Sequence, residues 1–103
     1  MGNAFGTKIV TVPTGNVITG QLAIADVTAA AAQLTANNTP LTHGVFLSVK
    51  AADDIIYVGL AGVTQATGLA VHAGDNVFIP CNDASLLYID AAVNGDAVTF
   101  LAV

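Results

Sequence analysis

Short apolar runs rich in β-branched and aromatic residues alternate with turn-forming residues along the whole chain. The runs cover residues 7–12, 17–25, 44–50, 55–59, 69–71, 76–79, 86–92 and 97–103. Gly, Pro, Asn and Asp separate them at a spacing of roughly ten residues, which is typical of strands in a small β-sandwich or barrel. We therefore expect an all-β fold of about eight short antiparallel strands.

The stretch 44–59 holds two of these runs, joined by a connection over 51–54, and predicts a β-hairpin. Neither run has a polar side, because Phe46 lies opposite the other apolar positions of its run and 55–58 is apolar throughout. A strand with one face in water should alternate, whereas a strand buried on both faces need not. We expect more apolar surface than one small core can bury, and hence self-association or docking onto a larger lattice. The alternative is a closed sandwich whose Ala-rich outer strands tolerate solvent.

Three other segments carry local signals. Asn-Gly-Asp at 94–96 predicts a type I′ turn and a closing hairpin between the last two strands, because both central residues tolerate positive φ. Gly20, in the middle of its strand, predicts a bulge or bend. For 26–36, Asp26 could cap a helix and four consecutive Ala favour one, but the segment is short and has no charge to solvate an outer face. We predict a strand there.

The composition adds constraints on partners. The 103 residues include two Lys, no Arg and seven acids, all Asp, for a net charge of −5. This balance argues against nucleic acid, which is bound by neutralising phosphates, and against anionic membrane surfaces. No apolar run approaches the length needed to cross a bilayer. The single Cys81 excludes an internal disulfide, and we expect synthesis in a reducing cytoplasm.

Candidate chemistry is sparse. Cys81, His43 and His72 lie in no recognisable catalytic motif, and they are too few for a zinc site. Asp pairs such as Asp53-Asp54 offer oxygen ligands, but their spacing matches no calcium loop and each pair also suits its turn. We expect no enzyme activity, no metal and no cofactor. The alternative for the aspartate pairs is a cation shared between subunits at a symmetry axis.

From residue 44 onward the motifs follow a recognisable order. They are Gly44-Val45, Asp53-Asp54, Ile56-Tyr57-Val58-Gly59, Gly62-Val63-Thr64, Thr67-Gly68-Leu69, Gly74-Asp75, Asp83 with Leu87-Tyr88-Ile89, Gly95-Asp96 and Thr99–Val103, with Ala32–Thr35 ahead of them. This order resembles a small β module of tailed-bacteriophage virion proteins, described as head decoration, capsid cement or head-fibre proteins. The first 27 residues carry no part of the resemblance.

The resemblance implies a capsid decoration (cement) protein on the virion exterior, a homotrimer that binds the major capsid protein lattice. The alternative is a head-fibre or tail-associated module that binds carbohydrate or receptor on the host surface. We expect an N-terminal arm over 1–6 and one domain over 7–103, with 44–103 as its most recognisable module. The expected oligomer interface is Phe46, Ile56, Val58 and Leu101, and the expected capsid-contacting arm residues are Phe5, Ile9 and Val10.

Overall fold

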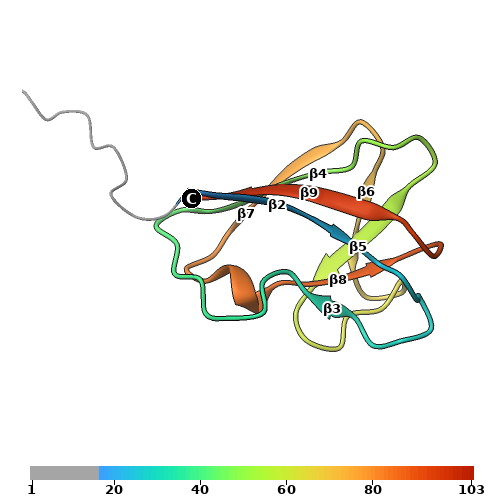
Figure 1. Cartoon of the computed structure of the whole chain (residues 1–103), viewed down its shortest axis with the longest axis horizontal. Coiled ribbons are helices and arrows are strands. Elements are labelled where there is room, and N and C mark those ends of the chain that lie inside the picture. The colour runs from blue at the N-terminus through green and yellow to red at the C-terminus, as the bar shows by residue number, and fades with distance from the viewer. Residues whose placement is uncertain (1–16) are drawn as a thin grey trace, which may run out of the picture.

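The computed structural model describes residues 17–103, which form two four-stranded antiparallel β-sheets packed face to face (Figure 1). Within this range the helical structure is a single 3-10 turn. The elements are β2 (Ile18–Ala23), β3 (Ala32–Gln33), β4 (Gly44–Ser48), β5 (Ile55–Gly59), β6 (Leu69–His72), β7 (Asn76–Pro80), η1 (Ala84–Leu86), β8 (Tyr88–Ala91) and β9 (Ala97–Ala102). The predicted all-β sandwich is thereby confirmed. The arm over 1–6 and the strand over 7–12 lie outside the described residues, as do Phe5, Ile9 and Val10.

The strands alternate between the two sheets as the chain proceeds. Sheet 1 has the order β2-β9-β4-β7, and sheet 2 has the order β3-β8-β5-β6. Only the β5–β6 connection joins neighbours within one sheet; every other connection between successive described strands crosses to the opposite sheet. Both predicted hairpins are therefore wrong in their pairing, because β4 and β5 lie in different sheets, and so do β8 and β9.

The turn over 94–96 explains the second of these errors. Gly95 does have a positive φ of 94°, but Asn94 is not among the positive-φ residues of the described chain. A type I′ turn needs positive φ at both central residues, so this turn is of another kind. It reverses the chain direction and carries it across the core into the other sheet.

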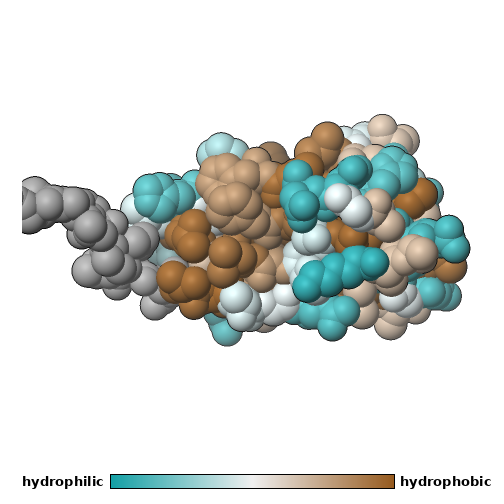
Figure 2. Space-filling model, turned by 90° about the horizontal axis from the view of Figure 1, so that it is seen from above, coloured by the Kyte–Doolittle hydropathy of each residue, from teal (hydrophilic) through white to brown (hydrophobic). Residues whose placement is uncertain are grey.

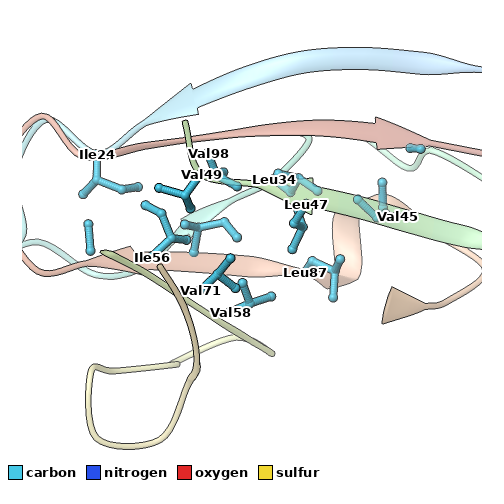
Figure 3. Packing of buried hydrophobic residues seen from close by; sticks show 14 residues of the cluster. Ile24, Leu34, Val45, Leu47, Val49, Ile56, Val58, Val71, Leu87 and Val98 are labelled. Carbon is cyan, nitrogen blue, oxygen red and sulfur yellow. The ribbon is translucent and has the colours of Figure 1, made fainter. Parts of the chain in front are cut away.

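The core lies between the sheets and is built from the inward positions of each strand (Figure 3). In sheet 1 the inward register places Val45 beside both Ile79 and Ala102. In sheet 2 it places Ile56 between Val71 and Ala91. Burying each of the large aliphatic side chains contributes about 1.5–3 kcal/mol, so this layer is the main source of stability.

The apolar outer side of β5 is partly covered by the chain itself. The loop between β5 and β6 packs back on sheet 2, and its Val63 is buried against Gly59 and Gly68. Gln65 Nε2 donates to the carbonyl oxygen of Ala91 at 2.9 Å. Tyr57, on the outer side, is consequently half-buried. The lack of alternation in β5 thus reflects cover from this loop on one face and the core on the other.

Two local predictions need correction. The segment 26–36 is mostly turn, with only two residues in β3, and the Asp26 carboxylate accepts from both the N–H and the hydroxyl of Thr28. These two bonds lower the pKa of Asp26, and the bond from the Thr28 hydroxyl has the larger effect.

Gly20 forms no bulge, since the β2–β9 register is unbroken. It makes room for a ring instead: a Cβ there would lie 2.8 Å from Cζ of Phe100.

Gly44 gives a sharp test of the packing of β4 against β7. Its φ is 152°, and an added Cβ would lie 2.3 Å from the Ile79 carbonyl oxygen and 2.8 Å from Pro80 Cα. Because both are backbone atoms, Gly44→Ala should lower the free energy of unfolding by about 2–4 kcal/mol. Urea unfolding measures this loss. Gly62→Ala is the control, with φ 86° but nothing within 4 Å of the new Cβ. Equal losses in the two variants would contradict the predicted clash.

Candidate interaction surface

The outward face of sheet 1 carries three apolar side chains in adjacent register positions. Phe46 on β4 is paired with Phe78 on β7 and with Leu101 on β9. Phe46 is 47% exposed and Phe78 40%, and Leu101 is half-buried. We call Phe46, Phe78 and Leu101 the outer apolar cluster. They stand out because an antiparallel sheet normally presents polar side chains on its solvent face.

The two phenylalanines form a preorganised pair. Their ring centroids are 4.6 Å apart with an interplanar angle of 48°. Such tilted aromatic pairs gain about 0.5–1.5 kcal/mol beyond the burial of their area. The pair therefore holds its shape without a partner, and little side-chain entropy remains to be lost when a partner covers it.

Polar side chains occupy the rest of this face. Gln21, Ser48, Asn76 and Thr99 point outward in register with one another, and the Thr99 hydroxyl donates to the Ser48 carbonyl oxygen at 3.1 Å. Together with Phe46, Leu101 and Lys50 they line a shallow, open groove. In Figure 2, which views the molecule from above Figure 1, apolar side chains gather toward one end, whereas hydrophilic and apolar ones are mixed over the other half.

All seven aspartates lie in the described part of the chain, and none is on the outward face of sheet 1. Five of them occupy four connections that hydrogen bonds tie together at one end of the sandwich. We call this end the acidic end; its aspartates are Asp26, Asp53, Asp54, Asp75 and Asp96.

Two carboxylates of the acidic end bond crosswise to the backbone. Asp96 Oδ2 accepts from the N–H groups of Ile55, at 3.3 Å, and Val93, at 3.2 Å. Asp54 Oδ2 accepts from the Ala97 N–H at 3.1 Å. Asp96 thus caps the start of β5, which follows the turn that contains Asp54. Asp54 in return caps the start of β9, which follows the turn that contains Asp96. These carboxylates fix the positions of the β4–β5 and β8–β9 connections, which is a structural role.

Asp83 plays a similar part at the opposite end, where it caps η1. Its Oδ1 accepts from the N–H of Thr39 at 2.8 Å, and from the N–H and hydroxyl of Ser85 at 2.9 and 2.7 Å. The Thr39 bond, followed by the two from Ser85, lowers the pKa of Asp83 from its ordinary 3.8.

This lowered pKa predicts an acid-dependent loss of stability. A depressed folded-state pKa stabilises the fold fully above the unfolded pKa, and the gain is lost as pH falls through the folded value. We expect unfolding titrations below pH 3.8 to show a smaller loss for Asp83→Asn than for the original chain. The lowered pKa of Asp26 makes the same contribution to the pH dependence of stability in both proteins, so it cancels when their acid profiles are compared. Identical acid profiles would contradict this role of Asp83.

The structure places the four expected interface residues in two different environments. Phe46 and Leu101 are neighbours on the outward face of sheet 1. Ile56 is 0% exposed and Val58 is 4% exposed, and both lie in the core. Their assignment to an oligomer interface is corrected, because a side chain buried within its own domain offers no surface to a partner. Phe78 was not among the expected residues. The sequence does carry a signal for it, because in a strand Phe78 lies on the same face as Asn76 and Pro80, and that face is the exposed one.

The candidate chemical groups do not form a site. Cys81 is half-buried against the core, and its backbone N–H donates to the His43 carbonyl oxygen at 3.3 Å. His72 Nδ1 lies 3.8 Å from an Asp75 oxygen, with both side chains largely exposed. Among residues 17–103 no three His, Cys, Asp or Glu side chains are grouped to hold a metal ion. The same residues contain no helix long and apolar enough to span a bilayer.

Comparison with known proteins gave no match to a family model, to a curated protein or to a solved structure.

Proposed function

We propose that this protein is a bacteriophage capsid decoration (cement) protein that assembles as a homotrimer on the outside of the head. The motif order from Gly44 onward supports a virion module. The observation that carries the proposal is the outer apolar cluster, an exposed aromatic pair on an open sheet face. Exposed contiguous apolar patches mark protein–protein contacts in soluble domains.

The mechanism under this proposal is mechanical. Apolar surface removed from water contributes about 25 cal/mol per Å², and aromatic side chains are the usual anchors of protein interfaces. Sister copies bury the outer apolar cluster, and each oligomer then presents several capsid contacts at once. Linked contacts raise the overall affinity well above that of one contact. The proposed capsid-contacting residues are Phe5 in the N-terminal arm and Ile9 and Val10 in the segment that follows it.

Self-association is tested by placing a charge within the cluster. Phe46→Asp should convert the oligomer to monomer, because it would bury an unpaired carboxylate next to Phe78. Sedimentation equilibrium measures the change, with circular dichroism to verify folding. Leu60→Asp is the control, since Leu60 is a large exposed apolar residue on the β5–β6 loop of sheet 2. An intact Phe46→Asp oligomer, or an original chain that is monomeric at high concentration, would overturn the proposed contact.

Capsid binding is tested separately. Virions of the phage that encodes this chain should show it by electron microscopy as density at the three-fold points of the head lattice. Heads assembled without the chain should lack this density and regain it when the purified protein is added. Density on the tail alone, or no density, would overturn the decoration role.

A second candidate is a carbohydrate-binding module of a head fibre or tail. The favouring observation is that Phe46 lines one groove with the outward amide and hydroxyl groups of Gln21, Asn76 and Thr99. Apolar walls with a few placed polar groups are typical of small-ligand sites. A glycan array probed with the original chain and with Phe46→Ala should show hits that the variant loses. An array without hits, with and without Ca²⁺, would overturn this candidate.

A further inference from the structure

The turn between β8 and β9 contains the one Asn-Gly pair of the sequence, Asn94-Gly95. Both residues are exposed to water. Gly95 has a φ of 94°, and a Cβ added there would meet nothing within 4 Å. Because glycine has no side chain, its backbone nitrogen is unhindered. The side-chain amide of Asn94 therefore has an accessible nucleophile in the next residue.

Such a pair can react with itself, and Asn is one of the chemically labile residues of proteins. The Gly95 nitrogen attacks Cγ of Asn94, its proton leaves with the side-chain amino group as ammonia, and a succinimide ring remains. Water then opens the ring. If the bond from Cγ to nitrogen breaks, the product is aspartate with a normal backbone. If the backbone carbonyl bond to nitrogen breaks, the product is isoaspartate, in which the chain continues through Cγ.

Hydrogen bonds to the β2–β3 connection hold both reacting groups. The Gly95 N–H donates to the Ile24 carbonyl oxygen at 2.7 Å. Asn94 Oδ1 accepts the Val27 N–H at 2.8 Å. Attack requires the Gly95 nitrogen to be free of its acceptor and the Asn94 side chain to be free to move onto that nitrogen. The reaction is therefore held off while both bonds are made.

The two bonds differ in how firmly the connection anchors them. Ile24 is 6% exposed and packs in the core. Of residues 25–30, by contrast, Val27 is partly buried and the others are exposed. Segments with few buried contacts open locally without unfolding of the whole domain. The bond from Val27 is therefore the first to open, and its opening releases the Asn94 side chain.

We propose that Asn94 is a site of spontaneous deamidation, and that its bond to Val27 sets how fast the folded chain reacts. The proposal is independent of the proposed function, since no partner takes part in the reaction. Water is the co-reactant, and the exposed turn is in contact with it. Loss of ammonia to the solvent makes the change one-way.

The two products have different consequences for the acidic end. Aspartate at position 94 keeps an oxygen that can accept the Val27 N–H, and it adds one carboxylate to the five already there. Isoaspartate adds a methylene group to the backbone of the turn and displaces Asp96 from Ile55, whose N–H it accepts at 3.3 Å. Chains whose β2–β3 connection has opened are thereby permanently loosened.

Peptide mass spectrometry tests the site. The folded chain and a sample unfolded in guanidinium chloride are incubated at mildly alkaline pH in water enriched with heavy oxygen. We expect label at residue 94 of the unfolded sample, and labelling at least about tenfold slower in the folded one. Asn76 is the internal control, because the β-branched Val77 crowds the nitrogen that follows it. Equal rates in the two samples, or no label at residue 94 in the unfolded one, would refute the proposal.

A backbone variant tests the protecting bond. Val27 is the second residue of a turn in which the Ala29 N–H donates to the Asp26 carbonyl oxygen at 3.2 Å, and Pro suits that position. Val27→Pro removes the N–H that holds Asn94, whereas the matched control Val27→Ala keeps it. Loss of one hydrogen bond should speed labelling of the folded Pro variant by about two- to tenfold over the Ala variant.

Equal labelling of the two folded variants, or none in either, would contradict the role of the Val27 bond. Urea unfolding of both separates this bond from global stability. A faster reaction matched by an equal rise in unfolding of the whole domain would assign the rate to that unfolding and would also refute the proposal.

The products are compared last. Asn94→Asp reproduces the normal product and should unfold at the same urea concentration as the original chain. The isoaspartate form, separated from aged protein by chromatography, should unfold at a lower concentration. Equal stability of the isoaspartate form and the original chain would refute the proposed loosening of the acidic end.

Discussion

Replacing Ile56 by Ala is expected to lower the free energy of unfolding by about 2–5 kcal/mol. Ile56 is fully buried, lies between Val71 and Ala91 in sheet 2, and faces sheet 1 across the core (Figure 3). The truncation removes buried methyl groups and leaves a cavity that the surrounding strands only partly close. Because small domains are stable by about 5–15 kcal/mol, this is a large share of the total.

The adjacent residue provides the control for Ile56. Ile55 is chemically identical but points to the outer side of β5 and is half-buried. Ile55→Ala should cost clearly less in urea unfolding. A similar loss of stability for both variants would show that β5 is buried equally on its two faces. That result would support the expectation from the sequence that neither face of this strand is exposed to water.

Replacing Asp96 by Ala is expected to cost about 2–4 kcal/mol. The side chain is 5% exposed and accepts the backbone N–H groups of Ile55 and Val93. Without it both donors lose their partner at the junction of two connections, and a buried unsatisfied donor costs about 1–3 kcal/mol. Amide hydrogen exchange at Ile55 and Val93 should accelerate together with the loss in urea unfolding.

Two variants define the meaning of the Asp96 result. Asp96→Asn keeps one acceptor oxygen and should lose less stability than Asp96→Ala. Asp75→Ala removes an exposed acid of the same end, whose carboxylate accepts the His72 N–H at 3.2 Å, and should cost under about 1 kcal/mol. If Asp75→Ala were as damaging as Asp96→Ala, net charge rather than backbone capping would explain the effect.

The positions of the strands were predictable from the sequence, whereas their partners were not. Runs of apolar residues bounded by Gly, Pro, Asn and Asp mark where strands begin and end. A short polar turn indicates that the chain reverses, but the reversed strand can pair with its predecessor or cross to the facing sheet. In this fold the crossing connections at 51–54 and 92–96 are held by Asp54 and Asp96, which bond to residues 43 and 41 positions away. Such distant bonds leave no local pattern.

The candidate interface was predictable only in part. Phe46 departs from the alternation of its strand, and this departure identifies an outward apolar residue. In β5 every position from 55 to 58 is apolar, so the pattern does not distinguish Ile56 and Val58 from Ile55 and Tyr57. The distinction is made by the β5–β6 loop, which covers the outer side, and loop packing has no periodicity to detect.

The place of β9 within sheet 1 has a consequence for folding during synthesis. β9 comes after every other described strand in the sequence, yet it lies between β2 and β4 and supplies the register for both. Ribosome-bound chains that stop before residue 97 should therefore leave β2 without β9, its neighbour among the described strands, and sheet 1 divided. Topologies that depend on such distant pairings fold slowly. Nascent chains should accordingly remain open to proteolysis until β9 has left the exit tunnel, and then become resistant in one step.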